Sequence, residues 1–342
     1  MKFLVRTILC LIFVSAMAGT ACAQSPLMFS ELGDFRLENQ QVIKDCKLGY
    51  RIFGEPDADK TNVVVFPTWF AGTTQELVDT GMIGPGKLID TSRLYVIAIE
   101  SFGNGVSSSP SNSTTQSGPS FPEFTIRDMV NAEHRFLTRD LHLERAYAVV
   151  GISMGGMQAF QWMVSYPGFF QKAVSIVGTP RLATSDLLLL QAEIEAIEAG
   201  RNCGNARLGM KTISAVHTFA LYTPSYLSAH ASPGDFPAYL AKIEKGLERF
   251  NPDDWEWQLK ALMTHDIFRA FGGSREKAAS AIQTKTLVIM SARDQLVNPE
   301  PSTAFSRLIK AEFAELSSDC GHIMFLCEKE KLRERVMSFL TR

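Results

Sequence analysis

The 342-residue sequence lacks several features that define whole classes of protein. Its formal net charge is only −2, so it has no basic excess of the kind that nucleic-acid-binding proteins use against phosphates. It contains neither a C-x-x-C pair nor a cluster of histidines, which argues against a metal site. It has no internal repeat and no heptad pattern, which excludes solenoids and coiled coils. With 46% hydrophobic and 20% charged residues, the composition is that of a globular protein with a sizeable core.

The sequence also lacks an apolar run long enough to span a bilayer. The strongest candidate, residues 8–17, is short and follows the positive charges of Lys2 and Arg6. An A-x-A cleavage pattern stands at residues 21–23. We therefore predict a signal peptide over residues 1–23 and a periplasmic or secreted protein, with no stable membrane insertion after cleavage.

Cysteine is scarce as well. A lipid anchor on Cys22 is an alternative to cleavage, but residues 19–21 lack the large aliphatic side chain that such signals usually carry. Beyond the signal, four cysteines remain: Cys46, Cys203, Cys320 and Cys327. An oxidising compartment permits disulfides, and four cysteines allow three pairings. A bond from Cys320 to Cys327 would stiffen the loop between them, while free buried cysteines fit the sequence equally well.

Short apolar segments alternate with helical patterns over most of the chain. The expected strands cover residues 35–43, 47–53, 62–66, 94–99, 146–150, 172–177, 285–291 and 313–317, and the expected helices cover 125–141, 154–166 and 328–340. The first two strands are expected to pair antiparallel, and the continuous apolar runs are typical of buried parallel strands. The sequence therefore predicts an α/β fold, with a mostly parallel eight-stranded sheet covered by helices on both faces.

The alternation of strands and helices stops between residues 182 and 282. Four helices are expected there, over residues 185–199, 206–222, 235–250 and 253–271. Strand patterns return after residue 284, and the sheet needs those strands to be complete. We therefore predict a helical cap at 182–282, inserted into a core made of residues 24–181 and 283–342.

A G-x-S-x-G pentapeptide occupies residues 151–155, between an expected strand and an expected helix. This arrangement is typical of a nucleophile elbow, in which a strained turn lifts the serine hydroxyl above the sheet. The two flanking glycines are needed because side chains there would collide with the neighbouring backbone. The pattern predicts that Ser153 is a catalytic nucleophile.

A nucleophilic serine needs a base, and the base needs an acid to orient it. In this architecture the chain order is serine, acid, histidine. His322 and Asp294 each follow an expected strand, at the sheet edge that carries Ser153. Glu300 and Asp319 are the competing acids, and chain order with placement favours Asp294. An acyl-transfer reaction follows from such a triad.

The tetrahedral intermediate of such a reaction needs preorganised hydrogen-bond donors for its oxyanion. The backbone N–H of Met154, directly after the nucleophile, is one expected donor. The second is expected from the loop after the strand at 62–66, at Phe70, with Trp69 as the neighbouring alternative. Trp69 is also expected to contact the substrate.

Several blocks together make the chain resemble the homoserine O-acetyltransferase family of the α/β-hydrolase superfamily. The matching blocks are GPGKLIDTSRLYVI, FPEFTIRDMV, VVGISMGGMQAFQW, DWEWQLKALMTHD, SARDQLVNP and GHIMFL. The resemblance implies the same triad of Ser153, Asp294 and His322, and the same oxyanion donors, Phe70 and Met154. It requires no cofactor or metal bound to the protein, and it implies that a homodimer can form.

Three departures from the family's pattern bear on the reaction. The family typically has aspartate after the catalytic histidine, where this chain has Ile323. The family's His-Ala-x-Thr-Gly loop is replaced at residues 68–72, and its cap motif of Trp, Gly and Tyr is replaced at 200–203. Export also removes the protein from cytoplasmic acetyl-CoA. We therefore predict hydrolysis of small or medium acyl esters, with an O-acyltransferase as the alternative and a catalytically silent binding protein as the third hypothesis.

Overall fold

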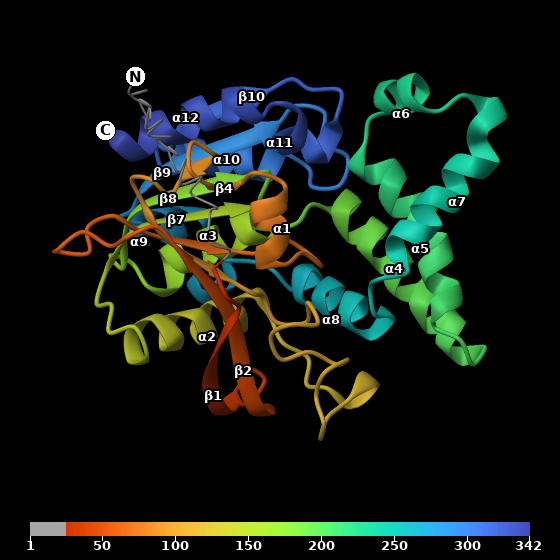
Figure 1. The fold of residues 1–342 in the computed structure, drawn as a ribbon, viewed down its shortest axis with the longest axis horizontal. Coiled ribbons are helices and arrows are strands. Elements are labelled where there is room, and N and C mark those ends of the chain that lie inside the picture. The colour runs from red at the N-terminus through yellow and green to blue at the C-terminus, as the bar shows by residue number, and fades with distance from the viewer. Residues whose placement is uncertain (1–24) are drawn as a thin grey trace, which may run out of the picture.

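The computed structural model describes residues 25–342, so the predicted signal peptide lies outside the described residues. A central sheet runs through the molecule, with helices on both of its faces and a separate group of helices to one side (Figure 1). Within the described range, no helix combines the length and the apolar character needed to cross a bilayer.

The main sheet has eight strands in the order β1-β2-β6-β3-β7-β8-β9-β10. They are β1 (Met28–Arg36), β2 (Val42–Phe53), β3 (Val63–Pro67), β6 (Tyr95–Ile99), β7 (Ala146–Ile152), β8 (Phe170–Ile176), β9 (Lys285–Ser291) and β10 (Glu312–Leu316). The β1–β2 and β2–β6 pairs are antiparallel and the other pairs are parallel. A separate two-stranded sheet joins β4 (Ile83–Gly84) and β5 (Ile89–Asp90). The predicted mostly parallel eight-stranded sheet is confirmed.

The central strands are apolar throughout because both faces of the sheet are covered. In β3, Val63 and Val65 belong to one hydrophobic cluster, while Val64 and Phe66 belong to the other. All five residues of this strand are buried. Since successive side chains of a strand point to opposite faces, a doubly covered strand must be apolar at every position.

Helices cover both faces of the sheet. Around the sheet lie α1 (Thr74–Asp79), α2 (Ile126–Arg139), α3 (Met154–Ser165), α10 (Glu300–Leu308), α11 (Met324–Cys327) and α12 (Lys329–Thr341). Met129 of α2 and Phe160 of α3 join one cluster, and Leu332 and Val336 of α12 join the other. Helix α2 begins with a capping box, in which Thr125 and Asp128 each bond the other's backbone N–H.

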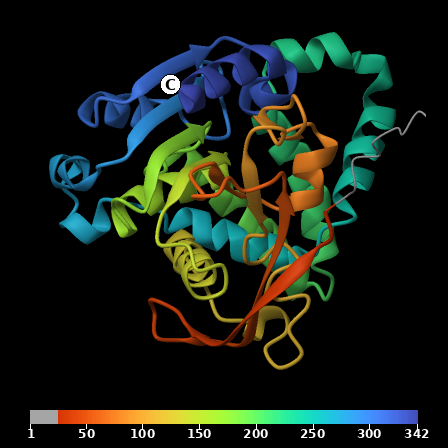
Figure 2. The ribbon, with the colours of Figure 1, turned by 60° about the vertical axis from the view of Figure 1, so that its left-hand side comes forward.

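The predicted strand over residues 35–43 is wrong. The chain turns between Leu37 and Gln41, whose backbones are hydrogen-bonded, and Gln40 adopts a positive φ of 69°. The first strand therefore ends at Arg36, and the second begins at Val42 and runs through the predicted 47–53 strand. The predicted antiparallel pairing of the two strands holds, as the long hairpin in Figure 2 shows.

Between β8 and β9 the described chain is mainly helical. The helices are α4 (Thr184–Asn202), α5 (Arg207–Leu221), α6 (Pro224–His230), α7 (Phe236–Leu247), α8 (Pro252–Met263) and α9 (Arg275–Ala281). Strands β8 and β9 pair directly with each other, so the sheet continues across this insertion. Figure 1 shows α4 to α7 standing beside the sheet, with α8 nearer to it.

The predicted single helix over residues 253–271 is also wrong. Helix α8 ends at Met263, and Asp266 forms a β-bridge with Arg181. The His265 side chain bonds the carbonyl of Thr179 at 2.9 Å, which holds the turn in place. This pairing with a distant segment interrupts the helix, and only a short 3₁₀ turn, Arg269–Phe271, follows.

Candidate active site

Ser153 stands at the sharp turn between β7 and α3. Its φ of 55° and ψ of −119° fall outside the regions that L-residues normally occupy. A Cβ on Gly151 would lie 2.0 Å from the carbonyl oxygen of Gly155, and a Cβ on Gly155 would lie 2.7 Å from that of Pro67. Only glycine therefore permits these two backbone crossings, as the pentapeptide predicts.

The structure brings Ser153, His322 and Asp294 together in one hydrogen-bonded chain. The Nε2 atom of His322 lies 2.8 Å from Ser153 Oγ, and its Nδ1 atom lies 2.7 Å from Asp294 Oδ2. All three residues are buried. They follow β7, β10 and β9 respectively, so three parallel strands deliver them to one edge of the sheet.

The Asp294 carboxylate is fixed by its own loop. Its Oδ1 atom accepts the backbone N–H groups of Leu296 and Val297, both at 2.9 Å. The other carboxylate oxygen, Oδ2, is the one that contacts His322 Nδ1. The competing acid Asp319 forms an exposed ion pair with Arg293.

The loop carrying His322 is closed by a disulfide between Cys320 and Cys327. This is one of the pairings that the sequence left open. Of the remaining described cysteines, Cys46 is buried and Cys203 is exposed, and neither is bonded. Burial raises the pKa of the Cys46 thiol to about 12, so that thiol stays protonated and unreactive at neutral pH.

The loop after β3 approaches the start of α3. Ala71 has a positive φ of 54°, and the N–H of Gly72 donates to the carbonyl of Trp69, which makes a tight turn. The backbone N–H groups of Phe70 and Met154 donate to no acceptor within residues 25–342. The structure thus leaves both predicted donors without a protein acceptor in this part of the chain.

Four buried or half-buried polar side chains that the sequence analysis did not identify hold this loop. Gln258 accepts the N–H of Ala71 at 2.6 Å and donates to the carbonyl of Phe102 at 2.7 Å. Gln158 donates to the carbonyl of Thr68.

The far end of the loop is held by Asn104 and Glu100. Asn104 donates to the Gly72 carbonyl, and the buried Glu100 carboxylate accepts from Asn104 and from Thr74. Burial raises the pKa of Glu100. Gln258 lies within the DWEWQLKALMTHD block, so the family resemblance of that block was the sequence signal that could have identified it.

A cavity of about 580 Å³ opens above Ser153 and His322. Its inner wall is mostly apolar and aromatic, with contributions from Phe70, Trp255, Leu296, Phe325 and Leu326. Trp69 also lines it, with its indole folded over Gly72 and its ring centroid 5.6 Å from that of Phe325. The lining also includes the polar and aromatic side chains of Tyr222, Tyr226, Tyr239 and Lys242. Core and inserted helices therefore build the cavity jointly.

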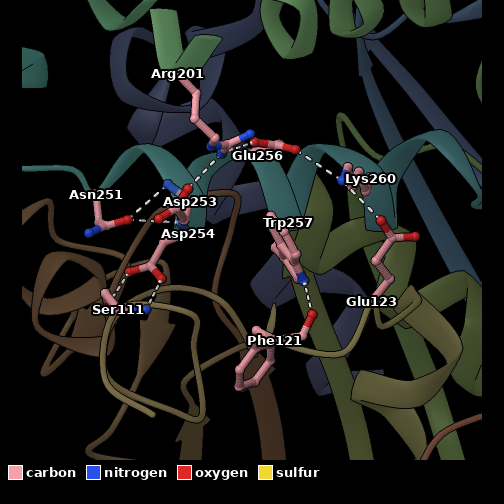
Figure 3. Close-up of polar contacts among 10 residues, drawn as sticks. All are labelled: Ser111, Phe121, Glu123, Arg201, Asn251, Asp253, Asp254, Glu256, Trp257 and Lys260. Carbon is pink, nitrogen blue, oxygen red and sulfur yellow. Dashed lines mark hydrogen bonds and ion pairs between the residues drawn. The ribbon is translucent and has the colours of Figure 1, made fainter. Parts of the chain in front are cut away.

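Charged side chains of α8 bond α4 on one side and the core on the other (Figure 3). Arg201 bonds Glu256 at 2.5 Å, and Lys260 contacts the same carboxylate at 2.9 Å. At the other side of the helix, Asp254 accepts the backbone N–H and the hydroxyl of Ser111. Burial raises the pKa of Asp254 to about 6. These contacts hold in place the helix that carries Gln258.

Within residues 25–342, no three or more His, Cys, Asp or Glu side chains are grouped so that they could hold a metal ion.

Comparisons with known proteins agree with this architecture. The family model described as "alpha/beta hydrolase fold" matches residues 86–198. An ethyl acetate hydrolase from Pseudomonas veronii is 31% identical over 319 residues, which cover 87% of this chain and 89% of that protein. A homoserine O-acetyltransferase from Methanocorpusculum labreanum is 30% identical over 349 residues, covering 89% of this chain and 71% of that protein. The solved structure of the acetyl esterase MekB is similar with a TM-score of 0.84, at 26% identity, over 92% of this chain and 95% of that chain.

Proposed function

The chain belongs to the homoserine O-acetyltransferase-like family of the α/β-hydrolase superfamily, and we propose that it is an exported serine esterase cleaving small or medium acyl esters. The hydrogen-bonded chain from Asp294 through His322 to Ser153 carries this proposal. The names of two relatives, an ethyl acetate hydrolase and an acetyl esterase, support the substrate class.

The proposed reaction has two steps. The Ser153 hydroxyl donates its proton to His322 Nε2 as Oγ attacks the acyl carbonyl, and Asp294 accepts the Nδ1–H and stabilises the imidazolium. The N–H groups of Phe70 and Met154 stabilise the oxyanion. His322 then protonates the departing alcohol, which leaves an acyl group on Ser153. In the second step, water activated by His322 releases the free acid and regenerates the hydroxyl.

The cavity favours hydrolysis over acetylation of homoserine. Ile323 lies in its wall, where the resembled transferases have an aspartate. An aliphatic side chain offers no charge to the ammonium group of an amino acid. The observation that keeps an O-acyltransferase as the second candidate is the similarity to homoserine O-acetyltransferases.

One assay separates these functions. Residues 24–342 and the Ser153→Ala variant are incubated with 4-nitrophenyl acetate, with and without homoserine, and free acetate and O-acetylhomoserine are quantified. We expect Ser153-dependent acetate that homoserine does not divert. Formation of O-acetylhomoserine would establish the transferase instead, and equal turnover by both proteins would refute a serine mechanism. Ser120→Ala, which removes an exposed hydroxyl, is the matched control.

Substitution at Ile323 tests the same distinction from the opposite direction. Ile323→Asp would place a carboxylate in the cavity wall, so we expect any transfer to homoserine to rise at least tenfold relative to hydrolysis. The measurement is the ratio of O-acetylhomoserine to acetate. An unchanged ratio would show that this position does not select the acceptor.

We also propose that residues 1–23 direct export. The Cys320–Cys327 disulfide supports an oxidising compartment. When the full chain is expressed in a bacterium, the periplasmic or secreted fraction is expected to contain protein that begins at Gln24, as measured by mass spectrometry. An intact N-terminus in the cytoplasm, or a lipid on Cys22, would contradict this assignment.

A further inference from the structure

A second histidine–carboxylate pair lies in the inserted helices. His217 of α5 places its Nδ1 atom 2.9 Å from Oε1 of Glu193 on α4. The other oxygen of Glu193 accepts the indole N–H of Trp255 at 3.1 Å. Glu193 is 1% exposed and His217 is 8% exposed. Three helices, α4, α5 and α8, therefore converge on one buried carboxyl group.

Burying the Glu193 carboxyl group lowers the stability of the fold, and packing alone does not explain why an acid occupies this position. Removing a carboxylate from water is unfavourable unless cations or several donors replace the water. Glu256, in the same segment, is paired with Arg201 and Lys260. Glu193, by contrast, has no Lys or Arg partner within the described residues, and only His217 and Trp255 bond it. Because this arrangement is unfavourable for stability, we expect that it has a function, which is to fix the position of His217.

His217 faces the cavity that contains Ser153 and His322. Its ring centroid is 6.0 Å from that of Phe70, whose N–H is the proposed oxyanion donor, and 5.1 Å from that of Trp255. Because Nδ1 is held by Glu193, the ring orientation is fixed. The second nitrogen, Nε2, has no hydrogen-bond partner within residues 25–342 and is the atom left for a ligand.

We propose that His217 is a substrate-recognition residue, whose Nε2 hydrogen-bonds a hydroxyl group carried by the ester. The preferred substrates are then hydroxylated short-chain esters. Glu193 and Trp255 are positioning residues, which act by fixing the imidazole. This inference rests on the proposed esterase function and names its substrate class. A hydroxyl suits the site because it fits among aromatic rings and can both donate and accept.

Matched pairs of esters test the proposal. Replacing a terminal methyl by a hydroxyl converts propyl acetate into 2-hydroxyethyl acetate, and ethyl propanoate into ethyl hydroxyacetate. The first pair places the hydroxyl on the alcohol side and the second on the acyl side. We expect kcat/KM to favour the hydroxylated member of one pair by about tenfold, since one hydrogen bond contributes about that factor. Measurable hydrolysis with no preference in either pair would overturn the inference and leave the esterase function intact.

Variants of His217 and Glu193 test whether this pair causes the preference for hydroxylated esters. His217→Phe keeps an aromatic ring and is expected to abolish the preference, with kcat/KM for the apolar esters changing less than threefold. Glu193→Gln is the second variant, should His217→Phe fail to fold by circular dichroism, and is expected to lower the preference at least threefold. His142→Asn is the control, because His142 is exposed and does not line the cavity. A preference that survives in both His217→Phe and Glu193→Gln would refute the assignment, whereas absence of hydrolysis by the wild type would refute the proposed function.

Discussion

Two buried acids, Glu133 in the sheet core and Glu256 in the inserted helices, are accommodated in different ways. In the core, Glu133 of α2 bonds only the indole N–H of Trp162 at 2.6 Å, and burial raises its pKa to about 8. In the inserted segment, Glu256 of α8 is paired with Arg201 and Lys260. Glu133 is therefore neutral at pH 7, while the charge of Glu256 is compensated by two cations. The neutral acid suits an apolar helix interface, and the charged cluster suits a helix that joins two parts of the molecule.

The two regions also divide the proposed chemistry. Ser153, Asp294 and His322 all come from ends of core strands, where parallel strands deliver them to one edge. The inserted helices supply Gln258, which holds the loop after β3, and His217 in the cavity wall. If this division is correct, changes in the core remove the reaction, while changes in the inserted helices alter its rate or selectivity.

The largest effect is expected at the core acid. Asp294→Asn removes the carboxylate that orients His322, so we expect kcat on 4-nitrophenyl acetate to fall about 10⁴-fold with little change in KM. Steady-state kinetics at pH 7.5 measures this. Asp319→Asn, which alters an exposed acid in the neighbouring loop, should leave kcat within about twofold, since exposed pairs contribute little. A loss below tenfold in Asp294→Asn would remove the acid from the triad.

The second-largest effect is expected at Glu133, the neutral acid of the core, and it concerns how stability changes with pH. The pKa of Glu133 is about 8 in the folded protein and close to its ordinary value of 4.5 when unfolded. Between these values the unfolded chain releases a proton that the folded protein keeps, so the free energy of unfolding falls as pH rises. Each pKa unit corresponds to about 1.4 kcal/mol, so the fall from pH 5 to pH 8 should amount to a few kcal/mol.

Glu133→Gln is expected to flatten this decline, as measured by urea unfolding at pH 5 and pH 8. Glu144→Gln changes an exposed acid and should retain the decline. The same slope in Glu133→Gln and the wild type would show that Glu133 is ionised in the folded core.

A smaller effect is expected from the disulfide that closes the His322 loop. Replacing both Cys320 and Cys327 by serine should lower the free energy of unfolding by about 2–3 kcal/mol, the loop-closure contribution for so short a loop. Thermal or urea unfolding under non-reducing conditions measures this. Cys203→Ser, at an exposed free cysteine, should have no effect. Equal stability of the double variant and the wild type would contradict a formed disulfide.

The smallest effect is expected where the inserted helices contact the loop after β3. Gln258→Leu leaves the N–H of Ala71 without its acceptor, so the Phe70 donor should move and kcat should fall about 10- to 100-fold with KM little changed. Gln191→Leu, at an exposed position of α4, is the control. A rise in KM with kcat unchanged would show that Gln258 affects binding rather than the proposed oxyanion donor.

The site was more predictable than the details of the fold. The turn at Ser153 could be predicted because its geometry depends on a strand, two glycines and a helix that adjoin in sequence. His322 and Asp294 followed from chain order, since parallel strands end at one edge. The predicted strand over 35–43 failed because a turn without glycine or proline gave no signal in the sequence, and the predicted helix over 253–271 failed because a bridge to Arg181 interrupts it.

The sequence by itself determined the features that depend on neighbouring residues: the apolar strands, the strained serine and the order of the candidate triad. Only the tertiary structure decided which side chains support them. The N–H of Ala71 meets Gln258 across 187 positions, and Glu193 meets His217 across 24. The structure also decided which of the three cysteine pairings forms, although Cys320 and Cys327 are only seven residues apart. Hydrophobic periodicity and turn chemistry are local properties, whereas a hydrogen bond between distant segments depends on how the elements pack.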